Sequence, residues 1–286
     1  MASRSVEHRR IGTADVSPLG LGCAGFSLDY ADDEERAERT IIAAIEAGIT
    51  LLDTALAYTP AGQRNHNERL LRRLLARLPR AQRDRVLVST KGGHYRDGES
   101  FPVDGRPQTL RAHAESSLVS LGVDRIALYH LHWPDPQVPI EESIGTLAEL
   151  QQKGVIDQIG VSNVDVELLR RAQKTARIAS VQNKFNLYDQ TSRSVLAHCE
   201  ATGTAFLAYS PLGGTARSRT RPSPTLADIS ARHGATPAQT ALAWLWSLSS
   251  NLIPLVGATR PETLNGAVAA MAIRLTKEEI AALSGE

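Results

Sequence analysis

Cysteine is scarce in this chain of 286 residues, and the two that occur, Cys23 and Cys199, lie far apart in the sequence. That number and spacing do not resemble the disulfide framework of a small secreted domain or the paired ligands of a metal cluster. We therefore expect no metal site and a location in the reducing cytoplasm.

The chain also lacks an excess of charge of either sign. Its 32 lysine and arginine residues stand against 31 aspartate and glutamate residues, for a formal net charge of +1. This balance does not indicate a surface for nucleic acid or anionic lipid. No apolar run approaches the roughly 20 residues of a membrane-spanning helix, and residues 1–10 lack the apolar segment of a signal peptide. We expect small-molecule partners, with neither nucleic acid nor membrane; no feature indicates an oligomeric state.

Short apolar runs alternate with helical patterns along the whole sequence, which is typical of parallel βαβ units. Eight such repeats close a (β/α)8 TIM barrel, an α/β fold that uses about 250 residues as one domain. We therefore predict a single barrel domain over residues 1–286, with a short N-terminal β-hairpin over residues 9–17. The expected barrel strands are residues 19–21, 50–53, 86–90, 126–132, 156–161, 180–183, 205–209 and 252–256.

Four polar residues follow the ends of successive expected strands, where barrel enzymes place their chemistry. Asp53, Lys91 and His132 end three strands, and Tyr58 lies on the loop after Asp53. A tyrosine phenol has a pKa near about 10 in water. We expect Lys91 to lower the pKa of Tyr58, and Asp53 to keep Lys91 charged. His132 would then orient the oxygen that Tyr58 protonates.

Each of these residues also has a plain structural interpretation. Asp53 and Lys91 form an ordinary ion pair in that case, and Tyr58 and His132 are part of the wall. His130 should point inward one layer below His132, because side chains alternate along a strand. We interpret His130 as a hydrogen-bonded core residue.

Residues 20–25 (GLGCAG) match the glycine fingerprint of a Rossmann dinucleotide site. That fingerprint requires a helix that opens at its last glycine. We expect no helix there, because residues 26–30 precede the helix start that Asp32 and Glu35 indicate. The glycines are therefore interpreted as the first barrel strand and its loop.

The segments at residues 51–58 (LLDTALAY), 89–93 (STKGG) and 131–136 (LHWPDP) resemble the catalytic segments of the aldo-keto reductase family in order and spacing. The resemblance runs from about residue 11 to residue 264. It implies an NADPH-dependent oxidoreductase that reduces an aldehyde or ketone to an alcohol. In that role Tyr58 is the general acid, Lys91 and Asp53 adjust it, and His132 orients the carbonyl.

The resemblance also implies contacts to the nicotinamide cofactor. Ser162, Asn163 and Gln182 would bond the carboxamide, and Tyr209 would stack on the ring. The rest of the cofactor would contact Ser210, Leu212, Gly213, Gly257, Thr259 and Arg260.

Three positions depart from the family pattern at the adenine end of this site. Thr263 replaces a basic residue that is common where the 2'-phosphate is preferred, which leaves Arg260 as the candidate for that contact. Gly266 and Ala267 stand where an acid and an asparagine are usual. NADPH is therefore the expected cofactor, and NADH stays open. Arg217, Arg219 and Arg221 on the expected loop over residues 211–224 could meet phosphate or simply be solvated.

Aromatic residues beyond three strand ends are candidates for the substrate pocket: Phe26, Tyr95 and Trp133. They suggest a partly apolar carbonyl compound. The sequence stops soon after the helix begun at residues 276–279, which suggests an open pocket.

Two alternatives remain open at this point. The first is a catalytically slow NADPH-binding subunit of the same fold that reports redox state to a partner protein. The second is another barrel enzyme, such as a phosphate-binding isomerase or an aldolase that uses Lys91 as a Schiff-base amine. Asp53 beside Lys91 argues against the neutral amine that the aldolase requires.

Overall fold

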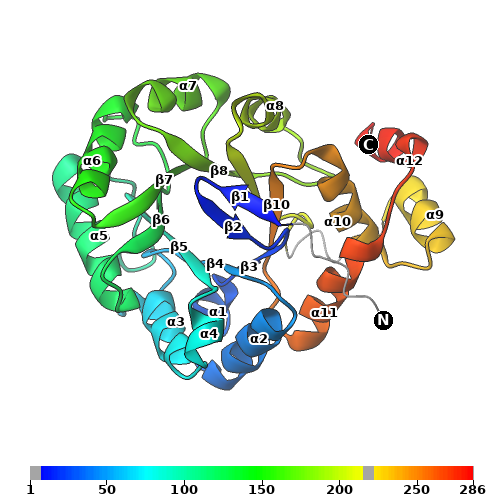
Figure 1. The fold of residues 1–286 in the computed structure, drawn as a ribbon, viewed down its shortest axis with the longest axis horizontal. Helices are drawn as coiled ribbons and strands as arrows, with labels where there is room; N and C mark the ends of the chain where they lie inside the picture. The colour runs from blue at the N-terminus through cyan, green and yellow to red at the C-terminus, as the bar shows by residue number, and fades with distance from the viewer. Residues whose placement is uncertain (1–7, 215–221, 286) are drawn as a thin grey trace.

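Eight parallel strands close into a barrel in the computed structural model, which describes residues 8–214 and 222–285. The strand order around the barrel is β10-β3-β4-β5-β6-β7-β8-β9, so chain neighbours are also neighbours in space. Helices surround the strands (Figure 1). The strands are β3 (Gly20–Gly22), β4 (Leu51–Asp53), β5 (Leu87–Gly92), β6 (Ile126–Leu131), β7 (Ile156–Ser162), β8 (Ile178–Lys184), β9 (Ala205–Tyr209) and β10 (Leu252–Val256).

All eight barrel strands lie where the sequence pattern predicts them, to within three residues. The (β/α)8 fold is therefore confirmed. The helices are α1 (Gly25–Leu28), α2 (Glu34–Glu46), α3 (His66–Ala76), α4 (Arg80–Arg83), α5 (Pro107–Leu121), α6 (Ile140–Gln152), α7 (Val166–Thr175), α8 (Arg193–Thr202), α9 (Pro224–Arg232), α10 (Pro237–Leu248), α11 (Pro261–Ala269), the 3-10 turn η2 (Ala270–Ala272) and α12 (Lys277–Ser284).

The glycine fingerprint behaves differently from our expectation in one respect. Helix α1 begins at Gly25, the last glycine of the fingerprint, and we had expected no helix there. It spans only four residues, and α2 then begins after Asp33, whose side chain accepts from the Arg36 amide. The cap is thus one residue later than Asp32. A closed barrel still excludes a Rossmann sheet, because that fold is an open sheet.

A two-stranded hairpin, β1 (Arg9–Ile11) and β2 (Ala14–Val16), covers one end of the barrel (Figure 1). Ile11 and Val16 are fully buried and belong to the same apolar cluster as inward-facing barrel residues such as Leu51 and Leu128. The hairpin therefore closes the N-terminal end of the barrel. A second, larger apolar core lies between the sheet and the helices. The C-terminal end of the barrel is left to carry polar groups.

No helix within residues 8–214 and 222–285 combines the length and the apolar character needed to cross a membrane.

Candidate active site

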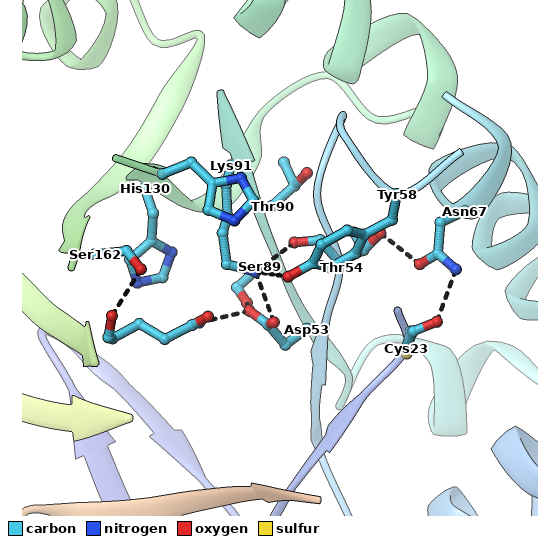
Figure 2. Close-up of polar contacts among 12 residues, drawn as sticks. Cys23, Asp53, Thr54, Tyr58, Asn67, Ser89, Thr90, Lys91, His130 and Ser162 are labelled. Carbon is cyan, nitrogen blue, oxygen red and sulfur yellow. Dashed lines mark hydrogen bonds and ion pairs between the residues drawn. The ribbon is translucent and has the colours of Figure 1, made fainter. Parts of the chain in front are cut away.

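The side chain of Lys91 is fully buried and its ammonium contacts three oxygen atoms. Its Nζ atom lies 2.6 Å from Oδ2 of Asp53, 2.8 Å from the carbonyl oxygen of Thr54 and 3.4 Å from Oη of Tyr58. These residues come from the ends of β4 and β5 and from the loop after β4. Figure 2 shows the amino end of Lys91 directed at Asp53 and Tyr58. The structure thus brings together three residues that the sequence pattern predicts at one site.

The other carboxylate oxygen of Asp53 is held by two neutral donors. Ser89 Oγ donates to Asp53 Oδ1 at 2.5 Å, and Gln182 Nε2 donates to the same atom at 2.8 Å. Such bonds favour the ionised carboxylate and fix its orientation toward Lys91. Burial by itself lowers the pKa of Lys91, but the nearby Asp53 and Tyr58 outweigh burial and raise it above its ordinary value. Lys91 is therefore a stable cation, as expected.

The pKa of Tyr58 corrects our expectation. Burial raises it, and the opposing effect of the Lys91 ammonium is smaller, so the net pKa lies above the ordinary value rather than below it. The sequence could not supply the depth of burial, which decides the sign. Tyr58 is consequently protonated at neutral pH, which is the state that a proton donor needs. Lys91 still acts in the predicted direction, because it reduces the cost of forming the phenolate.

His132 follows β6 and is almost fully buried. Burial lowers its pKa well below the ordinary value, and the Lys91 ammonium adds to this. Its ring lies edge-on to the Tyr58 ring, with centroids 5.8 Å apart. A neutral imidazole therefore lies beside the phenol. His130 is the core residue that we predicted, since its Nε2 atom lies 2.9 Å from Ser180 Oγ inside the barrel.

The residues expected to hold a carboxamide meet at the ends of β7, β8 and β9. Ser162 pairs in register with Gln182 and donates from Oγ to the Gln182 carbonyl at 2.6 Å. Asn163 donates from Nδ2 to Ser162 Oγ at 3.0 Å and to the His132 carbonyl at 3.0 Å. Tyr209 Oη donates to Asn163 Oδ1 at 2.8 Å. Gln182 also bonds Asp53, so this set is continuous with the Lys91 site.

Two residues at these strand ends have backbone conformations that are rare for residues other than glycine. Asn163 has φ = 60° and Ser210 has φ = 49°. Left-handed non-glycine residues cost free energy and cluster at functional sites. After Ser210, Leu212 packs against the apolar core between the sheet and the helices. Gly213 has φ = 85°, which a residue with a side chain rarely adopts.

The candidate residues of the adenine end lie after β10. Gly257 and Arg260 are exposed, and Arg260 precedes α11 as its N-cap. Thr259 lies against the β3 loop, since a Cβ atom placed on Gly25 would come within 2.9 Å of its Cγ2 atom. Of the departing positions, Thr263 is exposed, Gly266 accepts a hydrogen bond from Gln239 Nε2 at 3.0 Å, and Ala267 is buried. Arg217, Arg219 and Arg221 lie outside the described residues.

The candidate substrate residues fall in three different environments. Trp133 is 41% exposed beside the site, whereas Phe26 is 1% exposed and belongs to the core. Phe26 thus packs in the core between the sheet and the helices, and its place in the substrate pocket stays a prediction. The ring of Tyr95 packs edge-on against His113 of α5, with centroids 5.4 Å apart. The structure places His94, rather than Tyr95, next to His132.

The sequence interpretation missed His94 and several supporting residues. The His94 ring is edge-on to His132 at 4.9 Å between centroids and stacks on Phe101 at 5.8 Å. No periodic pattern identifies His94, because it lies beyond the end of β5, where the path of the loop sets its direction. Ser89 could have been found, since it lies two residues before Lys91 and must face the same side of the strand.

The model of the aldo/keto reductase family matches residues 18–285. "Probable aldo-keto reductase 1" of Glycine max is 30% identical over 315 residues, which cover 98% of this chain and 88% of the plant protein. A thermostable aldo-keto reductase, solved with the inhibitor epalrestat, has a TM-score of 0.82 and 30% identity, with 98% of this chain and 99% of that one covered. An aldo-keto reductase from Klebsiella pneumoniae, solved with NADPH, has a TM-score of 0.81 and 26% identity, with 100% and 95% covered.

Proposed function

This chain belongs to the aldo/keto reductase family, and we propose that it is an NADPH-dependent carbonyl reductase with Tyr58 as its general acid. The observation that carries the proposal is the position of the Lys91 ammonium, which lies between Asp53 Oδ2 at 2.6 Å and Tyr58 Oη at 3.4 Å. A buried, permanently charged amine beside a protonated phenol is suited to supporting negative charge on oxygen as a proton leaves.

The residues around Lys91 fit a nicotinamide. A carboxamide both donates and accepts hydrogen bonds, and Ser162, Asn163 and Gln182 offer hydroxyl and amide groups of both kinds at adjoining strand ends. Tyr209 brings an aromatic ring to the next strand end, held through its hydroxyl by Asn163. Ser210, Leu212 and Gly213 would follow the pyrophosphate, and Gly257, Thr259 and Arg260 would meet the adenine end. The exposed Arg260 guanidinium supports a preference for NADPH over NADH.

When bound, the reduced nicotinamide supplies the hydride for the carbonyl carbon. The protein supplies the proton and the orientation. Negative charge that grows on the carbonyl oxygen is met by the Tyr58 hydroxyl, which donates its proton to that oxygen. The phenolate left behind is stabilised by Lys91, whose own charge is held by Asp53. Neutral His132 orients the same oxygen by a hydrogen bond.

The substrate pocket that we propose is bounded by aromatic rings above His132. The His94 ring lies near both His132 and Trp133, with 6.4 Å between the His94 and Trp133 centroids, and it stacks on Phe101. Trp133 and Phe101 are both about two-fifths exposed. Flat apolar surface beside the acid favours an aldehyde or ketone that carries an aromatic or extended apolar group.

The experiment that tests this function is a titration followed by a turnover assay. Quenching of tryptophan fluorescence would give the Kd for NADPH and for NADH separately. The protein would then be mixed with the tighter cofactor and a panel of aryl and alkyl aldehydes. Oxidation of NADPH that requires both protein and aldehyde supports the proposal. Tight binding without turnover across the panel would instead support the redox-reporting subunit.

The aldolase alternative is tested by borohydride. A Schiff base at Lys91 requires a neutral amine, and the raised pKa of Lys91 opposes one. We expect no covalent adduct at Lys91 after borohydride treatment with a carbonyl compound. A trapped adduct would overturn the assignment of Lys91 as a permanent cation.

A further inference from the structure

The side chain of Asn67 lies at the centre of a buried hydrogen-bond network behind Tyr58, although the proposed chemistry gives it no part. Asn67 is the second residue of α3 and is fully buried. Its Oδ1 atom accepts from Thr54 Oγ1 at 2.6 Å, and its Nδ2 atom donates to the Cys23 carbonyl at 2.8 Å and to Ser27 Oγ at 2.7 Å. Figure 2 shows Asn67 between Thr54 and Cys23. One amide thus joins the loops after β3 and β4.

The main chain of Asn67 extends this network to the acid itself. Its backbone amide donates to the carbonyl oxygen of Tyr58 at 3.2 Å. Asn65, two residues earlier, has φ = 52° and allows the chain to turn into α3 at this point. The backbone of Tyr58 is therefore held by the same residue that fixes Thr54.

Thr54 connects Asn67 to the catalytic cation. The Thr54 hydroxyl bonds Asn67, and the Thr54 carbonyl oxygen accepts from Lys91 Nζ at 2.8 Å. The contact from Lys91 to Tyr58, at 3.4 Å, is the longest of the three contacts of Nζ. A shift of the Thr54 carbonyl would move the Lys91 ammonium that it binds, and a shift of the Tyr58 backbone would move the phenol, so either would change the contact between Lys91 and Tyr58.

We propose that Asn67 is a positioning residue, which sets the Lys91 to Tyr58 contact by holding Thr54 on one side and the Tyr58 backbone on the other. This inference rests on the proposed function. Asn67 and Thr54 would then do more than pack α3 on the barrel, because they would also influence the rate of proton transfer from Tyr58. Geometry of this kind matters, because a misplacement of about 1 Å can cost on the order of 10²-fold in rate.

A second hydrogen bond between α3 and the barrel provides a matched control, because it supports the structure without leading to Lys91. Thr90 Oγ1 donates to Glu68 Oε1 at 2.6 Å, and both residues are fully buried. This bond joins the neighbouring residue of α3 to the neighbouring strand β5, just as the bond from Thr54 joins Asn67 to the loop after β4. Thr90 points toward the helices, whereas Lys91 points into the barrel, since side chains alternate. Loss of either hydroxyl weakens α3, but only Thr54 leads to the cation.

The test compares Thr54→Val, Thr54→Ser and Thr90→Val in the whole protein. We expect Thr54→Val to lower kcat by about 10²-fold with the Kd for NADPH unchanged. The loss of rate at alkaline pH should move to higher pH, because a phenol less well supported by Lys91 is a weaker acid. Thr54→Ser, which keeps the hydroxyl, should restore kcat. Thr90→Val should lower stability and leave kcat and the pH profile in place.

A second variant and a readout that needs no turnover keep the test independent of the proposed function. The aspartate of Asn67→Asp can still accept a hydrogen bond from Thr54 but cannot donate one to the Cys23 carbonyl. We therefore expect Asn67→Asp, like Thr54→Val, to lower kcat and to raise the pKa of Tyr58. Ultraviolet titration of the phenol, as a difference from Tyr58→Phe, should show a higher Tyr58 pKa in Thr54→Val than in the wild type. If the wild-type protein shows no turnover, the proposed function is contradicted, whereas the positioning role can still be tested through the pKa of Tyr58. Unchanged kcat and phenol pKa in Thr54→Val and Asn67→Asp would overturn the positioning role.

Discussion

Lys91 and Asp53 form a salt bridge inside the barrel, with 2.6 Å between Nζ and Oδ2 and side-chain exposures of 0% and 5%. A buried pair of this kind gains little net free energy, but breaking it leaves one charge without compensation. Substitution of either residue should therefore be costly, because it would leave the other charge buried without a partner.

Substitution of Asp53 tests this relationship through stability. We expect Asp53→Asn to lower the free energy of unfolding by about 3–5 kcal/mol, because the Lys91 ammonium would be buried without an anion. Urea denaturation at neutral pH measures the change. Asp228→Asn removes one partner of the surface pair between Asp228 and Arg232 and should cost at most about 1 kcal/mol. Equal losses in the two variants would contradict the account of a buried charge.

Stability should fall in acid because of buried imidazoles. Burial lowers the pKa of His130 from its ordinary value of 6.5 to about 3. The unfolded chain therefore binds a proton on His130 below about pH 6.5, whereas the folded chain binds it only near pH 3. The stability that depends on neutral His130 is fully present above pH 6.5 and is lost between these values. His132, with its pKa also lowered, adds to the same trend.

The measurement is the urea midpoint of the wild type and of His130→Gln at several pH values between 7 and 4. We expect a shallower pH dependence in His130→Gln, since one of the titrating groups has been removed. A His130→Gln slope as steep as that of the wild type would exclude His130 as a contributor.

Most of the architecture is predictable from the sequence for a simple physical reason. A parallel strand buried on both faces must be a short apolar run, and the eight runs are visible without a structure. The proposed catalytic residues Asp53, Lys91 and His132 are predictable for the same reason, because they are polar residues at the ends of those runs. Polar groups at such buried positions require hydrogen-bonding or charged partners, so they indicate either a structural contact or a functional site.

The rest of the site depends on depth and on loop paths, which no local pattern encodes. The sign of the Tyr58 pKa shift follows from desolvation of the phenol, which the sequence does not give. Phe26 is a core residue because α1 forms at Gly25 and turns the ring inward. His94 and Asn67 reach the site from loop and helix starts, where the side-chain direction depends on tertiary structure.

The proposed pocket of aromatic rings, formed by His94, Trp133 and Phe101, predicts a specific change in substrate preference. Trp133→Ala should raise KM for an aryl aldehyde about 2- to 10-fold more than for a short alkyl aldehyde, which matches the ~0.5–1.5 kcal/mol of an aromatic pair. Steady-state kinetics with both substrates measures the ratio. Tyr95→Ala should leave the ratio unchanged, because the Tyr95 ring packs against His113. A Trp133→Ala variant with an unaltered ratio would place the substrate elsewhere in the barrel mouth.

The most direct test of the account is the replacement of one hydroxyl at each of two tyrosines. Tyr129 is fully buried on β6, and its Oη atom has no hydrogen-bond partner among the described residues, so Tyr129→Phe should keep wild-type kcat. Tyr58→Phe should lower kcat by about 10²- to 10⁴-fold, the usual contribution of a general acid, with the Kd for NADPH nearly unchanged. Wild-type kcat in Tyr58→Phe would contradict the account.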